Sequence, residues 1–526
     1  MLRPAVWLLA AAVLRAGGLA TATAIAPAPR NATSNATANA GYGPSAQRAQ
    51  AVVDTFRTSW AAYYEYAFPD DELRPVTNGS GNSRNGWGAS AVDALSTALL
   101  MREQQTVAQI LAHIPTIDWA HTSTPVSLFE TTIRYLGGLL SGYDLLSGPL
   151  SHLADDPALV AALLDQSVHL ANNLSFAFDT PSGVPYNTLN LSARTPVREP
   201  NSLATTGTLI LEWTRLSDLT RNTTYAALAN AAEAFLLVPS PPEAQPWPGL
   251  LGMYIEPTTG EFLDAFGGWV GGADSFYEYL LKTWIYDPER FGLLRERWQA
   301  AADSSIAHLA SHPESRPELT FLAVFNGTQR LLQSQHLACF AGGNFLLGAQ
   351  TLGVDAYRDF GLALVDGCHA TYNATATRIG PESFGWDPAL VPAGQEPFFA
   401  RHGFYILDAS YNLRPEVVEG YYYAWRATGD ERYREWAWDA FVAINGTARA
   451  GSAWSSVRDV DQVGGGGATD TMESFWFAEV LKYCYLIFAD GDDEWQVGGG
   501  GRDRWVWNTE GHPLRVYERE GVGGVV

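Results

Sequence analysis

The chain has 526 residues, 47% of them hydrophobic and 12% aromatic, so it has enough apolar material for a large core and does not have a disordered composition. Its formal net charge is −23, and only two of its basic residues, Lys282 and Lys482, are lysines. This balance excludes nucleic acids and other polyanions as partners because they need a basic surface, whereas a neutral sugar meets no such objection.

The N-terminus has the pattern of a secretory signal. Arg3 precedes the apolar run Ala5–Leu14, and small residues suited to cleavage follow, so residues 1–20 are predicted to be a signal peptide. The run is much shorter than the roughly 20 residues of a membrane-spanning helix, so a signal anchor is the less favoured alternative. Residues 21–45 are rich in Ala, Thr, Asn and Pro and have no apolar period, which predicts a disordered leader.

Glycosylation sequons add a second, independent sign of the secretory route. We therefore expect a location in the secretory lumen or outside the cell, with no stable membrane insertion once the signal is cleaved. The nine candidate asparagines are Asn31, Asn35, Asn78, Asn173, Asn190, Asn222, Asn326, Asn373 and Asn445.

The three cysteines allow one disulfide in an oxidising compartment and leave one thiol over. Cys339 and Cys368 flank an interval of loop length, whereas Cys484 lies inside the apolar run Tyr483–Phe488. We predict a disulfide between Cys339 and Cys368 and a buried free thiol at Cys484.

A turn followed by an amphipathic helix recurs along the chain. Counted at the last residue of each turn, successive copies are 66, 66, 66 and 76 positions apart, at Leu159, Tyr225, Phe291, Tyr357 and Tyr433. This spacing fits one helical hairpin plus a loop, and such hairpins must stack to bury their apolar faces. Residues 46–515 have room for about seven hairpins, which favours an all-α barrel of helix pairs as a single domain, with minor β content in loops and a C-terminal tail at 516–526. An open solenoid is the alternative.

Several predicted helices begin with an acidic residue. Each acid fits a capping role: Ser127 with Glu130 as a capping box, Asp274 and Asp470 as N-caps, and Glu416 after a proline in the first turn. If these helix starts meet at one mouth of a barrel, however, the acids gather in one pocket, with basic and aromatic neighbours beside them. Sugar hydrolysis requires such a pocket, since one carboxyl protonates the leaving oxygen and another activates water or attacks the sugar.

Long motifs are spread over nearly the whole chain, from about Ala51 to Pro513. They are Asp70–Pro75, Gly86–Ala89, Val92–Leu95, Phe129–Gly138, Pro185–Thr188, Asp274–Lys282, Leu413–Glu416, Met472–Phe475 and Asn508–Glu510. In these motifs the sequence resembles glycoside hydrolase family 47, the class I α-1,2-mannosidases.

The resemblance implies an (α/α)7 barrel that removes terminal α-1,2-linked mannose from high-mannose N-glycans with inversion, for which two carboxyls stand roughly 6.5–9.5 Å apart. By motif, the catalytic acids fall on Glu130, Asp274, Glu382 and Glu416. We assign Glu130 as general acid and Glu416 as general base. Asp274 could exchange roles with either, and for Glu382 a substrate contact is an equally good interpretation.

The resemblance also implies one Ca²⁺ held by Thr509, whose hydroxyl and carbonyl supply at most two of the six to eight oxygens that this cation takes. Waters and sugar hydroxyls would complete the shell. Substrate-binding residues implied by motif position are Arg134, His336, Arg414, Glu419, Glu473 and Glu510. The family's disulfide falls on the same cysteine pair, and we expect a monomer.

One departure concerns specificity. Family members confined to a single mannose carry Arg two residues before the catalytic Asp, whereas this chain has Gly272. The smaller residue leaves room, which predicts broad trimming of several mannoses. Two other functions stay open: a lectin-like quality-control receptor of the same fold with little hydrolysis, and an (α/α)-barrel glycosidase that does not need calcium.

Overall fold

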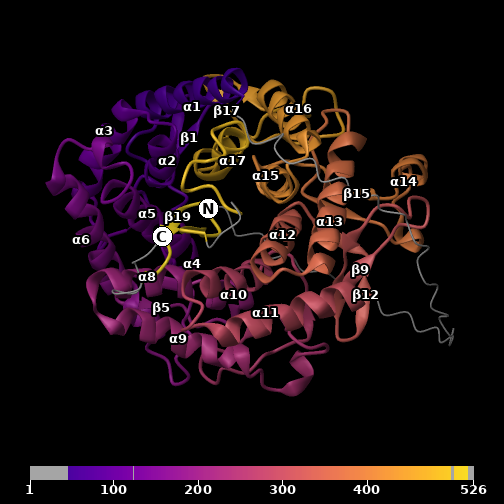
Figure 1. Cartoon of the computed structure of the whole chain (residues 1–526), viewed down its shortest axis with the longest axis horizontal. Helices are drawn as coiled ribbons and strands as arrows, with labels where there is room; N and C mark the ends of the chain where they lie inside the picture. The colour runs from indigo at the N-terminus through magenta and orange to yellow at the C-terminus, as the bar shows by residue number, and fades with distance from the viewer. Residues whose placement is uncertain (1–44, 123, 499–502, 519–526) are drawn as a thin grey trace. The chain divides into compact units, whose positions relative to one another are not determined.

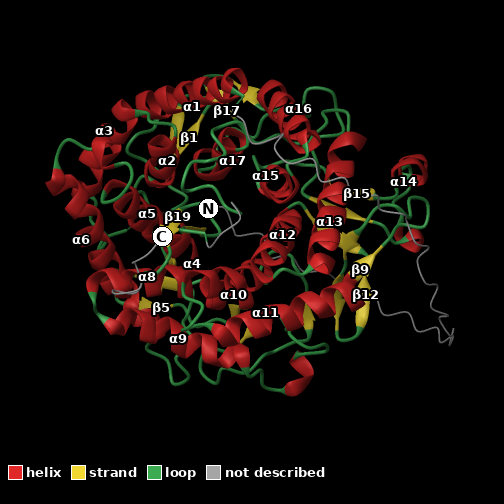
Figure 2. Ribbon diagram, in the orientation of Figure 1, coloured by secondary structure: helices red, strands yellow, loops and turns green. Residues whose placement is uncertain are grey.

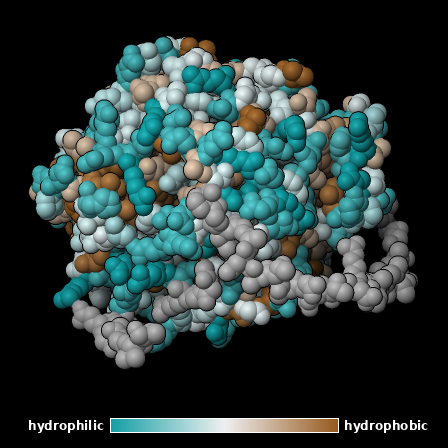
Figure 3. Space-filling view, turned by 45° about the horizontal axis from the view of Figure 1, so that its top comes forward, coloured by the Kyte–Doolittle hydropathy of each residue, from teal (hydrophilic) through white to brown (hydrophobic). Residues whose placement is uncertain are grey.

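The computed structural model describes residues 45–122, 124–498 and 503–518, all within one compact unit. The predicted signal peptide at 1–20, the leader up to residue 44, the sequons at Asn31 and Asn35 and the tail from residue 519 lie outside the described residues. Among the helices of the described part, none is both long and apolar enough to cross a bilayer. The visible face is mostly hydrophilic, with hydrophobic side chains scattered over it (Figure 3).

Helices arranged as two concentric layers make up the described unit (Figures 1 and 2). Each outer helix packs mainly against an inner helix next to it in the chain, except that α1 packs against α17. The outer helices are α1 (Ala46–Tyr66), α3 (Gln104–His113), α6 (Pro157–Leu174), α9 (Thr223–Leu237), α11 (Gly292–Ser304), α13 (Asp355–Ala374) and α16 (Glu431–Thr447). The inner helices are α2 (Ala89–Leu100), α5 (Gly137–Leu146), α8 (Ile210–Thr220), α10 (Asp274–Tyr286), α12 (Phe340–Leu352), α15 (Glu416–Thr428) and α17 (Leu481–Leu486).

Neighbouring inner helices contact one another from α2 to α17, and the π-helical turn Trp476–Val480 before α17 contacts α2. The described residues therefore form a closed (α/α)7 barrel, and the predicted fold is confirmed. The ring closes where the first described helix, α1, meets the segment that leads into α17. Phe56 of α1 packs edge-on against Phe477, with ring centroids 5.5 Å apart, and Trp476 Nε1 donates a hydrogen bond to Ser59 Oγ at 2.9 Å. The open solenoid is thereby excluded.

The two layers differ in how their sequences meet solvent. Every residue of α2 is buried, and so is every residue of α10 after Asp274, because both faces of an inner helix are covered. In α9, by contrast, five of fifteen residues are buried. An outer helix therefore shows the amphipathic period that sequence analysis detects, whereas an inner helix does not.

The five recurrent turns each precede an outer helix, namely α6, α9, α11, α13 and α16. Asp156, Asn222 and Asp430 accept hydrogen bonds from backbone N–H groups two residues later, as N-caps do. The repeat in the sequence thus follows the outer layer.

Short antiparallel strands occupy the connections between helices. The two-stranded sheets pair β1 (Glu72–Arg74) with β2 (Gly79–Gly81), β6 (Asn201–Ser202) with β7 (Tyr254–Ile255), β9 (Ala310–Ser311) with β10 (Phe321–Leu322), β16 (Arg449–Ala450) with β17 (Ala453–Trp454), and β18 (Trp505–Trp507) with β19 (Pro513–Arg515). The three-stranded sheets contain β3 (Val126–Ser127), β4 (Thr188–Asn190) and β5 (Thr195–Pro196); β8 (Phe266–Gly267), β11 (Val324–Asn326) and β12 (Gln329–Leu331); and β13 (Gln333–Gln335), β14 (Ser383–Gly385) and β15 (Tyr405–Asp408).

Further short helical segments lie between these elements. They include α4 (Leu128–Glu130), the π-helical turn Thr131–Leu136 that joins α4 to α5, α7 (Leu203–Gly207) before α8, α14 (Glu396–His402), and the π-helical turn Trp476–Val480 before α17. The β18–β19 hairpin contacts the inner helices α5 and α10, and it is this hairpin that carries the Asn508–Glu510 motif into the barrel.

Candidate active site

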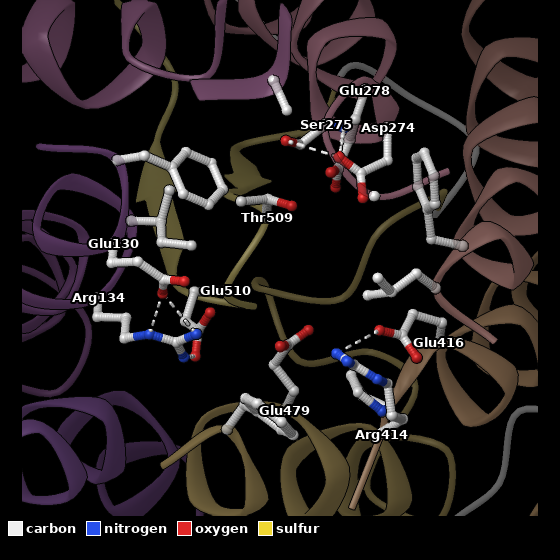
Figure 4. A pocket seen from close by; sticks show the side chains of 18 of the residues that line it. Glu130, Arg134, Asp274, Ser275, Glu278, Arg414, Glu416, Glu479, Thr509 and Glu510 are labelled. Atoms are coloured by element: carbon white, nitrogen blue, oxygen red, sulfur yellow. Dashed lines mark hydrogen bonds and ion pairs between the residues drawn. The ribbon is translucent and has the colours of Figure 1, made fainter. Parts of the chain in front are cut away.

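A cavity of about 520 Å³ opens inside the barrel, and its wall is rich in carboxyl groups. Nine of the residues singled out from the sequence line it together: Glu130, Arg134, Asp274, Arg414, Glu416, Glu419, Glu473, Thr509 and Glu510. Figure 4 shows Glu130, Asp274 and Glu416 reaching in from different sides around Thr509. Acids that lie far apart in the sequence therefore meet in one pocket.

Glu130 lies on a wall that is rich in arginine. Ser127 accepts a hydrogen bond from the Glu130 N–H at 3.2 Å, as half of the predicted capping box. The Glu130 carboxylate turns instead to Arg134, whose Nε and Nη2 both lie 2.8 Å from Oε2, and to Arg84, whose Nε is 3.5 Å away. Burial alone would raise the pKa of Glu130, but the positive charges of Arg84 and Arg134 lower it to about 2.

Arg84 is presented by a loop that Asp71 holds in shape. The Asp71 carboxylate accepts hydrogen bonds from the Tyr135 hydroxyl at 2.9 Å and from five backbone N–H groups, those of Arg84, Gly86, Trp87, Gly88 and Ala89. The motifs around Asp71 and Gly86 thus build one structural unit, which places a cation beside Glu130.

Asp274 lies on a wall without such cations. It is the first residue of α10 rather than its N-cap, which is Ala273, so the predicted capping role is wrong. Its Oδ1 accepts a hydrogen bond from the Ser275 N–H at 2.8 Å. Burial, together with the negative charges of Glu278 and Glu416, raises the pKa of Asp274 to about 7.

Glu416 begins α15 and is held from behind by His336. The imidazole Nδ1–H donates to Glu416 Oε2 at 2.7 Å, and Nε2 lies 2.9 Å from the Tyr372 hydroxyl. Although burial opposes it, the hydrogen bond from His336 and the charge of Arg414 lower the pKa of Glu416. His336 is 1% exposed and is not among the residues that line the cavity, so its position suits orientation of Glu416 better than contact with a sugar.

Glu382 is likewise absent from the cavity wall. Its carboxylate accepts hydrogen bonds from Arg414 Nε at 2.9 Å and from the Asn412 N–H at 3.0 Å. This geometry favours a role in positioning Arg414. The predicted catalytic or substrate-contact role of Glu382 remains untested.

Asp470 does not cap a helix either. It has a left-handed φ of 65°, and its carboxylate accepts hydrogen bonds from the Val76 N–H and the Thr77 hydroxyl, both at 2.7 Å. Asp470 therefore ties the segment near the C-terminal end to the β1–β2 connection, and Glu473 enters the cavity wall from the loop that follows.

The floor of the cavity is the turn between β18 and β19. Asn508 shapes this turn, because its Oδ1 accepts hydrogen bonds from the Glu510 and His512 N–H groups at 3.0 and 2.8 Å. Thr509 is held by its N–H, which lies 3.3 Å from the Tyr279 hydroxyl. Within the described residues, no hydrogen bond engages the hydroxyl or the carbonyl oxygen of Thr509.

The two oxygens of Thr509 suit a hard cation that takes most of its shell from water and ligand, because no cluster of acidic, histidine or cysteine side chains in the described residues could hold a metal by itself. Both oxygens are available, and eight carboxyl groups line the same cavity against three guanidinium groups. Calcium takes six to eight oxygens and tolerates irregular geometry, so two protein oxygens plus water and ligand oxygens can complete its shell. Burial raises the pKa of Glu419 to about 8, and a divalent cation nearby would favour its charged form.

Three charged residues of the cavity wall were absent from the predicted site. Glu278 lies one helical turn after Asp274, and Arg84 lies in a loop without a chemical signature of its own. Glu479 lies inside the apolar segment Trp476–Val480. An acid within a helix that is otherwise apolar was the available signal for Glu479, because such a residue needs a polar partner or a cavity.

The predicted disulfide and the buried free cysteine are present, and the described sequon asparagines lie at least partly at the surface. Cys339 and Cys368 form a disulfide with Cα atoms 6.0 Å apart, and Cys484 is free and buried. The exposed sequon asparagines of the described part are Asn78, Asn190, Asn222, Asn326 and Asn373. The partly exposed ones are Asn173 and Asn445.

Comparison with known proteins gives a consistent result. A family model described as glycosyl hydrolase family 47 matches residues 55–516. The chain is 57% identical over 478 residues to the probable mannosyl-oligosaccharide α-1,2-mannosidase 1B of Aspergillus clavatus, covering 90% of this chain and 94% of that protein. For the mannosyl-oligosaccharide α-1,2-mannosidase 1B of Aspergillus phoenicis the identity is 54% over 499 residues, covering 95% and 97%. The solved structure of the α-1,2-mannosidase from Trichoderma reesei aligns with a TM-score of 0.89 and 48% identity, covering 90% of this chain and 100% of that one.

Proposed function

Because this chain belongs to glycosyl hydrolase family 47, we propose that it is an α-1,2-mannosidase that removes terminal mannose from high-mannose N-glycans with inversion and with the help of Ca²⁺. The observation that carries this proposal is the convergence of Glu130, Asp274 and Glu416 on one cavity beside Thr509. An acidic cavity inside an acidic chain also suits a neutral glycan better than an anionic ligand.

An inverting reaction needs one carboxyl group that gives a proton and one that takes a proton from water. Glu416 suits the second task, since His336 and Arg414 keep its pKa low and hold it as a carboxylate. Asp274 suits the first, because its pKa of about 7 leaves it protonated in mildly acidic solution.

The sequence alone assigns Glu130 as the general acid and allows Asp274 to take that role instead. A pKa of about 2 argues against direct proton donation by Glu130. We therefore favour the exchanged assignment. In it, Asp274 is the acid, Glu416 is the base, and Glu130 is an ionised group that orients Arg84 and Arg134 and stabilises positive charge developing on the sugar.

Thr509 would hold the cation through its hydroxyl and carbonyl oxygens. When bound there, Ca²⁺ would bind vicinal hydroxyls of the sugar as a Lewis acid. The chain's own side chains then orient the sugar ring. Arg134 and Arg414 line the wall, and their guanidinium carbons lie 5.5 and 5.8 Å, respectively, from the centre of the Phe475 ring.

Broad trimming of several mannoses is part of the proposal. Gly272 lines the cavity with a φ of +94°, and a Cβ atom there would lie 2.9 Å from Met253 Sδ. Both the backbone conformation and the contact favour glycine, so this side of the cavity stays open to different glycan branches. Exposed sequons and the disulfide support a route through the secretory pathway.

Purified protein should be incubated with an α-1,2-linked mannose disaccharide, and the anomeric signals should be followed by NMR. We expect β-mannose to appear first, activity to stop in EDTA, and Ca²⁺ to restore it. α-Mannose as the first product would contradict inversion, and full activity in EDTA would favour the calcium-independent glycosidase. Binding without hydrolysis would favour the lectin-like receptor. A nine-mannose glycan that loses only one residue would contradict broad trimming.

A further inference from the structure

Both lysines of the chain are buried beneath the cavity. Lys282 on α10 is 1% exposed and Lys482 on α17 is 0% exposed, while every other basic residue apart from histidine is an arginine. Buried lysine is rare because desolvation of an ammonium group is costly. Neither side chain lines the cavity, so neither is placed to contact a sugar.

Lys282 compensates the charge of two acids on the inner helices α10 and α15. Its ammonium group donates to Glu278 Oε1, one helical turn earlier on α10. Its charge also acts on Glu419 of α15, whose pKa it lowers against the opposing effect of burial. Glu278 and Glu419 both line the cavity, so Lys282 lies behind that part of its wall.

Lys482 lies near a second group of acids, on the side of the cavity where α17 lies. Its ammonium group donates to the Gly511 carbonyl, in the turn that follows Thr509, and to Ser96 Oγ at 2.8 Å. Burial lowers the pKa of Lys482 to about 7 against the opposing effect of the negative charges of Glu479 and Asp93, so this group carries its charge in mildly acidic solution. Thus one ammonium group lies behind each of two groups of acids around the floor.

We propose that Lys282 and Lys482 are internal counter-charges that hold the floor carboxylates in place before a metal binds and that limit the affinity for the cation beside Thr509. This inference rests on the calcium site proposed above. Carboxylates crowded in a medium of low polarity repel one another unless a cation lies nearby. The lysines reduce that repulsion, but they also repel Ca²⁺, since both kinds of cation interact with the same acids.

The test uses Lys282→Met and Lys482→Met, which keep much of the side-chain length and remove the charge. Calcium affinity is measured by titration calorimetry at pH 6.5, where Lys482 is mostly protonated, and thermal unfolding is followed at the same pH with EDTA and with excess Ca²⁺. We expect a lower Tm than wild type in EDTA, a larger rise in Tm on adding Ca²⁺, and a Kd for Ca²⁺ lowered by roughly five-fold or more.

Arg215→Met is the matched control. Arg215 pairs with Asp144 between the inner helices α8 and α5, is also buried at 8% exposed, and lies outside the cavity wall. Its loss should lower Tm equally with and without Ca²⁺ and leave the Kd unchanged. Lysine variants that behave like this control would overturn the proposal, and so would a weaker affinity for Ca²⁺.

A variant that folds only in Ca²⁺ would support the proposal, because the metal then replaces the missing charge. A lysine variant that fails to fold even in excess Ca²⁺ would contradict it. If the wild-type protein binds no Ca²⁺, the proposed calcium site is wrong. If the wild type binds Ca²⁺ and the variants bind it with the same affinity, only the lysine proposal is wrong.

Discussion

The two carboxyl groups on opposite walls of the cavity, Glu130 and Asp274, have the same chemistry and opposite surroundings. Both line the cavity at the beginning of an inner helical segment, and both are partly exposed. Glu130 faces two guanidinium groups and has a pKa of about 2, whereas Asp274 faces a backbone N–H and two acids and has a pKa of about 7. Burial raises the pKa of each, so the neighbours decide which one stays ionised.

The largest effect is expected when Asp274 is replaced, because this tests directly whether Asp274 is the protonated carboxyl of the pair. Asp274→Asn should lower kcat by about 10²–10⁴-fold, because an amide cannot donate the proton that the leaving oxygen needs. Steady-state kinetics on the mannose disaccharide measures this loss. Asp355→Asn is the matched control, since Asp355 also begins a helix but lies on the outer layer with an exposed side chain paired to Arg358. Activity of Asp274→Asn within a few-fold of wild type would exclude Asp274 as the acid.

A substrate whose leaving group needs no proton separates the two walls. On α-mannosyl fluoride, Asp274→Asn should recover activity by about 10²-fold relative to its activity on the disaccharide, because only the proton donor becomes dispensable. Glu130→Gln should lose similar fractions on both substrates, since an ionised Glu130 acts through charge and orientation. The opposite pattern, with recovery for Glu130→Gln alone, would restore Glu130 as the acid.

The pH profile of the wild-type enzyme tests the same assignment without a mutation. Since Asp274 must be protonated and its pKa is raised to about 7, kcat/KM should fall about ten-fold per pH unit above that value. On the acid side, Glu416 must be ionised, and its lowered pKa should keep kcat/KM level down to a pH below the usual range of a glutamate. A profile that stays level well above pH 7 would count against Asp274.

The smallest effect is expected at Arg84. Arg84→Gln removes one of the two nearby cations, so the pKa of Glu130 should rise and kcat/KM should fall a few-fold below about pH 5. The measurement is the shift of the acidic side of the pH profile of kcat/KM relative to that of the wild type. Arg358→Gln provides the control because its ion pair with Asp355 is exposed, and exposed pairs contribute little. An unchanged limb would mean that Arg134 alone keeps Glu130 ionised.

Much of the fold was predictable because the outer helices meet water on one side. Their apolar period and their turns, such as Asp430 before α16, follow from local interactions. The disulfide between Cys339 and Cys368 was predictable from their spacing. The inner helices have a weaker apolar period in the sequence because they are covered on both faces. For the same reason Glu479, in its apolar segment, was not predicted to line the site.

By itself, the sequence determined the helical repeat, the all-α barrel, the family and most of the acids that line the cavity. Only the tertiary structure decided which acids are charged, since that depends on neighbours from distant parts of the chain. Arg84 reaches Glu130 from another segment, and His336 reaches Glu416 across 80 positions. It also decided that the two lysines lie beneath the cavity, because charge and burial combine only where the helices pack together.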